Sequence, residues 1–181
     1  MKTTLILISL MFSALHIFAQ ANYYTKTRTF NENGYTYQCD VPLSCDVTLY
    51  NKTNKWTYTS QIDTKTGGNY IHPDVYVPLI EDDNWTRAKR FAIVNNAFSA
   101  IEKQRVKGAK ESLIISMYIS PDTGKVVEVD FTFHTLSPYA TIPVSVYRKI
   151  ETELKANIWF TPTDFGKKLN YILYWWDQEP K

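Results

Sequence analysis

The sequence predicts an α+β fold, in which an N-terminal antiparallel β-meander precedes an α-β-β-α-β unit whose helices cover one face of a three-stranded antiparallel sheet. Three observations lead to this prediction. Residues 23–60 are rich in Thr, Tyr and turn formers, apolar residues recur at spacings of three and four along 85–106, and apolar and polar residues alternate along 113–134. Pleated strands favour the first and third patterns, and an amphipathic helix produces the second.

The first residues have the three-part plan of a secretory signal. One positive charge at Lys2 precedes an apolar run over residues 5–15, and small residues follow at Ala19 and Ala21. This run is shorter than the roughly 20 apolar residues that span a bilayer, so we expect a cleaved signal and no transmembrane anchor. Residues 1–19 form the predicted signal peptide, with cleavage after residue 21 as the alternative. The exported protein is then expected in the periplasm, at the cell surface or secreted.

Residues 20–83 are predicted to form a β-rich N-terminal region that ends in a connection. The Asn33-Gly34 pair supplies the positive backbone angles of a tight hairpin turn, and Thr- and Tyr-rich segments lie on both sides of it. Similar short runs follow, before Gly and Pro residues become more frequent. We expect a meander of about four strands, at residues 23–30, 35–39, 47–50 and 55–59.

Residues 84–181 are predicted to form the α+β unit, which begins with one long helix. The helix is expected to run from about Trp85 to Val106, with Gly108 beyond its end. A hairpin follows, whose strands at residues 113–119 and 127–134 are joined by a Pro-Asp-Thr-Gly turn. The predicted apolar face of the helix consists of Ala88, Phe91, Val94, Phe98 and Ile101.

A second helix and a last strand complete this unit. The helix begins after Thr141-Ile142-Pro143 and places Tyr147, Ile150 and Leu154 on one side. The strand extends over residues 169–176, and both of its alternating sets of side chains are rich in aromatic residues. The predicted order is therefore helix, strand, strand, helix, strand.

Two short segments of this unit resemble the TonB C-terminal domain family. Residues 119–127 read Ile-Ser-Pro-Asp-Thr-Gly-Lys-Val-Val, and residues 159–167 read Trp-Phe-Thr-Pro-Thr-Asp-Phe-Gly-Lys. In that family an Asp/Gly-Lys-Val turn links the first two strands, and a Trp-x-Phe-x-Pro-like segment precedes the last one. The resemblance extends over about residues 85–177 and implies helices packed on one face of a three-stranded antiparallel sheet.

The resemblance also implies a role in recognition. TonB uses this domain to pair with an extended peptide of outer-membrane transporters. The cleavable signal and the β-rich first half predicted for this chain are not part of that plan. The implied role is therefore that of an envelope protein that uses a sheet as a recognition scaffold, and not that of an energy transducer.

The sheet face away from the helices is the first candidate binding surface. Alternation places Tyr118 on this face, and we assign Tyr174 and Trp176 of the last strand to the same face. Their rings, hydroxyls and indole N–H would form a platform for a peptide or a glycan. Two alternatives stay open, since the N-terminal meander or a homodimer would bury the same surface.

The backbone of the last strand is the second candidate site. If this strand lies at a sheet edge, the backbone of Asn170, Ile172 and Tyr174 would pair with an incoming extended segment. The alternate side chains of that segment would then determine which sequences bind. A neighbouring strand or a twofold mate on that edge is the open alternative.

Few residues have the spacing expected of disulfide-bonded, metal-binding or catalytic groups. Cys39 and Cys45 are predicted to form a structural disulfide, because an oxidising compartment permits one. Neither thiol clusters with a histidine, so no metal is expected. Glu128 and Asp130 share a strand face at a spacing near that of paired catalytic carboxylates, although such alternation is typical of a solvated face. We therefore assign no catalytic residue.

Composition narrows the function further. Twenty basic and eighteen acidic side chains give a formal charge of +2, which is too balanced to indicate a nucleic-acid partner. The sequence has no nucleotide-binding or nucleophile motif, and no cofactor is expected. We expect a non-catalytic exported envelope protein that binds a protein or peptide. The alternatives are a structural or assembly protein with a buried aromatic face, a glycan-binding module, and a hydrolase that uses Glu128 and Asp130.

Overall fold

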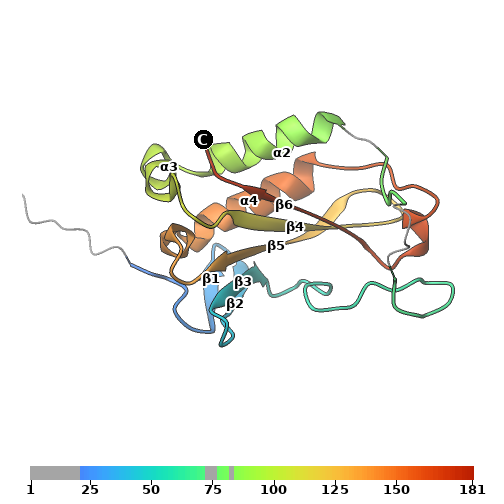
Figure 1. Cartoon of the computed structure of the whole chain (residues 1–181), viewed down its shortest axis with the longest axis horizontal. Helices are drawn as coiled ribbons and strands as arrows, with labels where there is room; N and C mark the ends of the chain where they lie inside the picture. The colour runs from blue at the N-terminus through green and yellow to red at the C-terminus, as the bar shows by residue number, and fades with distance from the viewer. Residues whose placement is uncertain (1–20, 72–76, 82–83) are drawn as a thin grey trace, which may run out of the picture.

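The protein is a mixed α+β structure built around one antiparallel sheet (Figure 1). The computed structural model describes residues 21–71, 77–81 and 84–181, so the predicted signal peptide lies outside the described residues. The strands are β1 (Arg28–Glu32), β2 (Tyr35–Asp40), β3 (Asp46–Asn51), β4 (Leu113–Ile119), β5 (Val126–His134) and β6 (Ile172–Gln178). The helices are α2 (Asn84–Ala97), α3 (Ala100–Val106) and α4 (Val144–Asn157), with short 3-10 turns η1 (Pro138–Thr141) and η2 (Gly166–Lys168).

The sheet has six strands in the order β1-β2-β3-β5-β4-β6, where we expected a separate meander and a three-stranded sheet. The two parts join because β3 pairs with β5, with Leu49 opposite Phe131. The N-terminal strands therefore extend the sheet sideways and do not cover its face (Figure 1). The fourth meander strand, expected at residues 55–59, is not formed, and this segment makes turns.

The first helical segment is two helices, which corrects the single helix expected over 85–106. Ser99 interrupts the segment because it begins α3 with a capping box, in which its hydroxyl accepts from the Glu102 N–H and the Glu102 carboxylate accepts from the Ser99 N–H. The change of axis also changes the buried face, so Ile101 is exposed. The buried residues of α2 are Thr86, Arg90, Val94 and Ala97.

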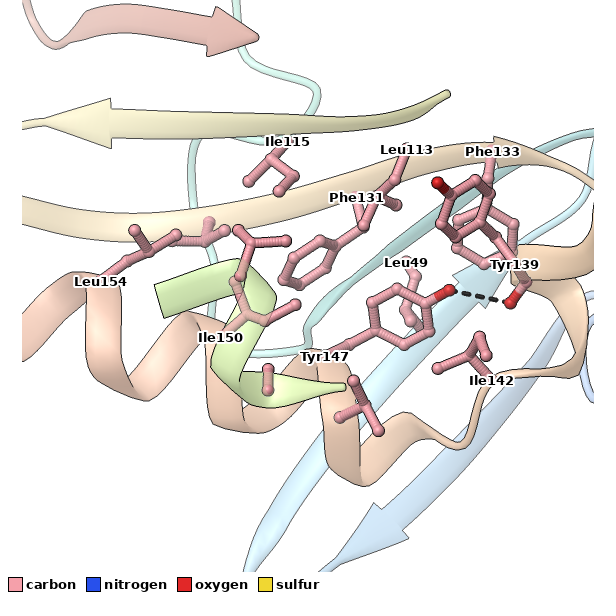
Figure 2. Packing of buried hydrophobic residues seen from close by; sticks show 14 of the residues in the cluster. Leu49, Leu113, Ile115, Phe131, Phe133, Tyr139, Ile142, Tyr147, Ile150 and Leu154 are labelled. Atoms are coloured by element: carbon pink, nitrogen blue, oxygen red, sulfur yellow. Dashed lines mark hydrogen bonds between the residues drawn. The ribbon is translucent and has the colours of Figure 1, made fainter. Parts of the chain in front are cut away.

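The main core lies between α4 and the sheet, as Figure 2 shows. Tyr147, Ile150 and Leu154 of α4 point towards β-strand side chains that include Leu113 and Phe131. The Tyr147 hydroxyl is fully buried and donates a 2.8 Å hydrogen bond to the Tyr139 carbonyl (Figure 2). This bond satisfies the polar end of an otherwise apolar contact, as buried tyrosines require.

Two glycine turns shape the hairpins. Asn33 and Gly34 both have positive φ between β1 and β2, as the tight turn predicted there requires. Gly124 also has positive φ, and the Phe160 N–H donates to its carbonyl at 2.9 Å. A Cβ atom at Gly124 would lie 1.8 Å from the Phe160 carbonyl oxygen, so the β4–β5 turn and the chain after α4 are fitted to a residue without a side chain.

Within the part of the chain that the structure describes, no helix has the length and apolar character needed to cross a bilayer.

Candidate functional site

Strand register divides the sheet into two faces with different surroundings. Met117 is opposite Tyr174, and Ile115 is opposite Trp176, so these four side chains lie on the face that α2 and α4 cover. The neighbouring residues of β4 point the other way. Tyr118 therefore lies on the far face, opposite Leu173 and Glu128.

The structure does not bring the three platform candidates together. Tyr118 is buried on the far face, whereas Tyr174 and Trp176 pack on the helix side against Arg90, whose guanidinium carbon lies 4.5 and 4.8 Å from their ring centroids. The assignment of all three rings to one open face is therefore wrong. The exposed aromatic residue of β6 is Trp175, which lies between Tyr174 and Trp176, points to the opposite face and is 62% exposed.

One end of the far face is closed by the chain segment that follows β3. The Glu128 carboxylate accepts the Lys55 N–H at 2.8 Å and the Trp56 N–H at 2.9 Å, one on each oxygen. Beside it, the Tyr118 hydroxyl donates to Asp130 at 2.7 Å. These bonds hold the turns around residue 56 against the sheet and remove Tyr118 from the surface.

Glu128 and Asp130 are consequently buried, which corrects the solvated face expected for them. Glu128 is 8% exposed and Asp130 is 4% exposed. Burial raises the pKa of Asp130, and the hydrogen bond from Tyr118 opposes this rise. Because both oxygens of Glu128 already accept backbone N–H groups, the geometry gives this carboxylate a structural role in closing the face.

The other end of the far face is an open groove of about 400 Å³. Ile114 lies at its centre by register, since it is opposite Thr132 on β5 and Asp177 on β6. The Trp175 ring contributes apolar surface to the lining. The charged and polar residues of the lining are Asp46, Glu111, Ser112, Thr132, His134 and Asp177.

The groove is acidic. Its three carboxylates come from β3 (Asp46), the approach to β4 (Glu111) and β6 (Asp177), and no lysine or arginine is among its described lining residues. A second hollow of about 390 Å³ shares Glu111 and His134 and contains Lys110, which is the one lysine among the described lining residues of the two hollows. The described residues contain no group of three or more His, Cys, Asp or Glu that would hold a metal ion.

His134 links the two hollows. It is opposite Asp46 in the β3–β5 pair, and its Nδ1 accepts the Leu136 N–H at 3.1 Å. This bond makes Nδ1 the acceptor, so Nε2 is the nitrogen left to donate.

The last strand β6 forms one end of the six-stranded sheet. No other described segment makes a backbone-to-backbone hydrogen bond with residues 172–178, apart from the β4 ladder. Ile172 and Tyr174 belong to this strand. Asn170 lies before it and is occupied by the chain at residues 60–62, since its Oδ1 accepts the Ile62 N–H and its Nδ2 donates to the Ser60 carbonyl.

The two cysteines are free thiols, so the predicted disulfide is absent. Cys39 lies in β2 opposite Leu49 and is fully buried in the core. Cys45 lies in the turn before β3, has a positive φ of 64° and is exposed. Burial raises the pKa of the Cys39 thiol to about 12, which makes it a core residue and not a reactive group.

These features define a mixed α+β domain with helices on a six-stranded sheet and an open groove on the far face. The chain belongs to the family described as Domain of unknown function (DUF5043), whose model matches residues 20–176. A crystal structure of a DUF5043 family protein from Bacteroides uniformis ATCC 8492 is similar, with a TM-score of 0.82 and 43% sequence identity over 88% of this chain and 95% of that chain. No curated protein matches. These matches do not confirm the resemblance to the TonB C-terminal domain family.

Proposed function

We propose that the protein is a non-catalytic, exported binding module of the cell envelope, which recognises an extended segment of another protein at β6. The observation that carries this proposal is the free edge of β6 together with its outward side chains. Leu173 is 40% exposed and Trp175 is 62% exposed, and Trp175 borders the groove. An added strand would complete the backbone ladder, and its side chains would reach the groove.

A comparison with the opposite edge supports this choice. Strand β1 carries Arg28 and Glu32 and is mostly exposed, which is the usual protection of an edge that stays unpaired. Strand β6 has the sequence Ile-Leu-Tyr-Trp-Trp-Asp-Gln, in which Asp177 is the one charged residue and lies near the C-terminal end. Exposed apolar side chains such as Leu173 and Trp175 on an edge strand are typical of a surface that receives a partner.

Two other functions are less well supported by the geometry. A hydrolase that uses Glu128 and Asp130 would need a carboxylate free to exchange protons, whereas Glu128 accepts two backbone N–H groups. A glycan platform would need several coplanar exposed rings, whereas Tyr118, Tyr174 and Trp176 lie on two faces. Export itself is supported by the apolar run over residues 5–15, and cell fractionation with N-terminal sequencing of the mature protein tests it.

The binding proposal is tested with a random library of short linear peptides displayed against the purified protein. Selected peptides are expected to slow amide hydrogen exchange at residues 172–178 and to bind Trp175→Ala at least about tenfold more weakly. Trp85→Ala is the matched control, since Trp85 is an exposed tryptophan on α2.

Two results would contradict the proposal. One is a set of selected peptides that leaves exchange in β6 unchanged and binds Trp175→Ala normally. The other is a stable homodimer in sedimentation velocity that Trp175→Ala dissociates, because a second copy would then occupy the edge.

A further inference from the structure

We infer that the segment bound at β6 carries a basic side chain, lysine or arginine, which lies in the acidic groove next to Trp175. This inference rests on the proposed function, because it names the chemistry of the partner at the same surface. The charge of the groove supports it. Asp46, Glu111 and Asp177 come from three separate parts of the chain and meet around one hollow.

These carboxylates have no cationic partner within the described residues. The salt bridges there join Glu151 to Lys155 and Asp164 to Lys167, and neither involves the groove. The chain as a whole has a formal charge of +2, so the groove is an acidic site on a weakly basic protein. A ligand with a positive group would therefore be attracted to this surface specifically.

The apolar part of the groove fits the rest of a basic side chain. Ile114 lies between Thr132 and Asp177 across the strands, and the exposed ring of Trp175 stands beside it. Lysine and arginine bury their aliphatic stems on apolar surface while the charged head stays near carboxylates. An aromatic ring at the same place adds a cation–π contact.

Other exposed rings of the protein show what is missing at Trp175. The ammonium of Lys89 lies 5.9 Å from the Trp85 ring centroid and 5.8 Å from that of Trp159. The guanidinium of Arg148 lies 4.3 Å from the Tyr35 centroid. Among the described residues no cation lies over Trp175, where carboxylates are the neighbours instead. The cation next to Trp175 would therefore come from the partner.

The first test uses a small probe and the unchanged protein. N-acetyl-lysine methylamide is titrated into the full mature chain, and the Trp175 indole N–H and the amides of the groove are followed by NMR. We expect these signals to shift with the lysine probe and not with N-acetyl-norleucine methylamide, which has the same aliphatic stem without the charge. Equal shifts with both probes, or no shift with either, would overturn the inference. A shift with calcium ions alone would do so as well.

The second test uses the peptides selected on β6. Replacing their basic residue by norleucine, or combining Asp46→Asn, Glu111→Gln and Asp177→Asn in the protein, is expected to weaken binding by about tenfold or more, with the larger effect at low salt. The control combines Asp122→Asn, Glu153→Gln and Asp164→Asn, which changes the net charge equally at exposed positions outside the groove. Peptides that protect β6 from exchange but bind the two triple variants equally would refute the basic partner and leave the edge-binding function intact.

Discussion

The guanidinium carbon of Arg90 lies 4.5 Å from the centroid of the Tyr174 ring, and the Nη2 of Arg90 donates a 3.1 Å hydrogen bond to the Tyr174 hydroxyl. Trp176 and Phe160 border the same guanidinium at 4.8 and 5.9 Å. Arg90 is only 3% exposed, so α2 is fixed to β6 by a buried cation held among aromatic rings. This contact supports the edge strand β6 from the helix-covered face of the sheet.

Arg90→Ala is therefore expected to lower the free energy of unfolding by about 2–4 kcal/mol, because it leaves a cavity and removes the ring contacts. Arg90→Lys keeps the charge but loses the planar contact, and should fall between alanine and the parent protein. Urea denaturation measures both. Arg87→Ala, on the exposed side of the same helix, is the control and should change stability by roughly 0.5 kcal/mol or less.

Gly124 and Gly108 form a matched pair, since both have a φ of 68°. An alanine Cβ at Gly108 would meet no atom within 4 Å, so Gly108→Ala should cost only the backbone strain, about 1–2 kcal/mol. At Gly124 the Cβ would collide with the Phe160 carbonyl oxygen. Gly124→Ala should cost at least about 2 kcal/mol more than Gly108→Ala in urea denaturation. Equal losses for the two variants would mean that the turn moves away from Phe160 freely.

Stability should depend on pH through Asp130. Because burial raises its pKa in the folded state above the ordinary value of 3.8, the folded protein holds this proton more tightly than the unfolded chain. The resulting stabilisation is present below the ordinary pKa and is lost as the pH rises through the folded value. Asp130→Asn keeps an acceptor for Tyr118 and has no proton to lose, so its stability relative to the parent should increase from acidic to neutral pH.

Urea denaturation of both proteins across that pH range measures this difference. Asp122→Asn, at an exposed position in the β4–β5 turn, serves as the control. A stability difference between Asp130→Asn and the parent that stays constant with pH would contradict the raised pKa.

The cysteines should differ in reactivity. Iodoacetamide at neutral pH is expected to alkylate Cys45 in the folded protein and to leave Cys39 unmodified, because Cys39 is buried and its pKa is raised. Unfolding in urea should make both thiols reactive. Mass spectrometry of peptides from the two conditions measures this. Recovery of a Cys39–Cys45 bridged peptide from the protein isolated from cells would contradict the free thiols.

The parts of the fold that the sequence predicts correctly have one-sided burial. Tyr147, Ile150 and Leu154 form the buried stripe of α4, and the Asn33-Gly34 turn joins two strands, as their patterns indicate. The break between α2 and α3 has a sequence signal, since Ser99 and Glu102 have the spacing of a capping box. The apolar spacing continues across this break, however, and on its own it predicts one continuous helix.

Other features depend on contacts between distant segments. Both alternating sets of β6 are aromatic, so the side of Trp175 follows only from its register with Ser116. The burial of Glu128 depends on the turns at Lys55 and Trp56, which fold back over the sheet. Likewise, the groove joins residues as far apart as Asp46 and Asp177, and no local pattern relates them.

Because β3 pairs with β5, the described strands form one sheet with two edges, and this bears on how many partner molecules could be bound. A further strand can pair with any edge of a sheet whose backbone N–H and C=O groups are unpaired. A molecule with two such edges can assemble into open-ended polymers. Among the described strands, β1 at one border carries Arg28 and Glu32, and β6 at the other border carries the exposed apolar side chains Leu173 and Trp175. The proposed pairing at β6 would then end after one added strand, as a one-to-one complex.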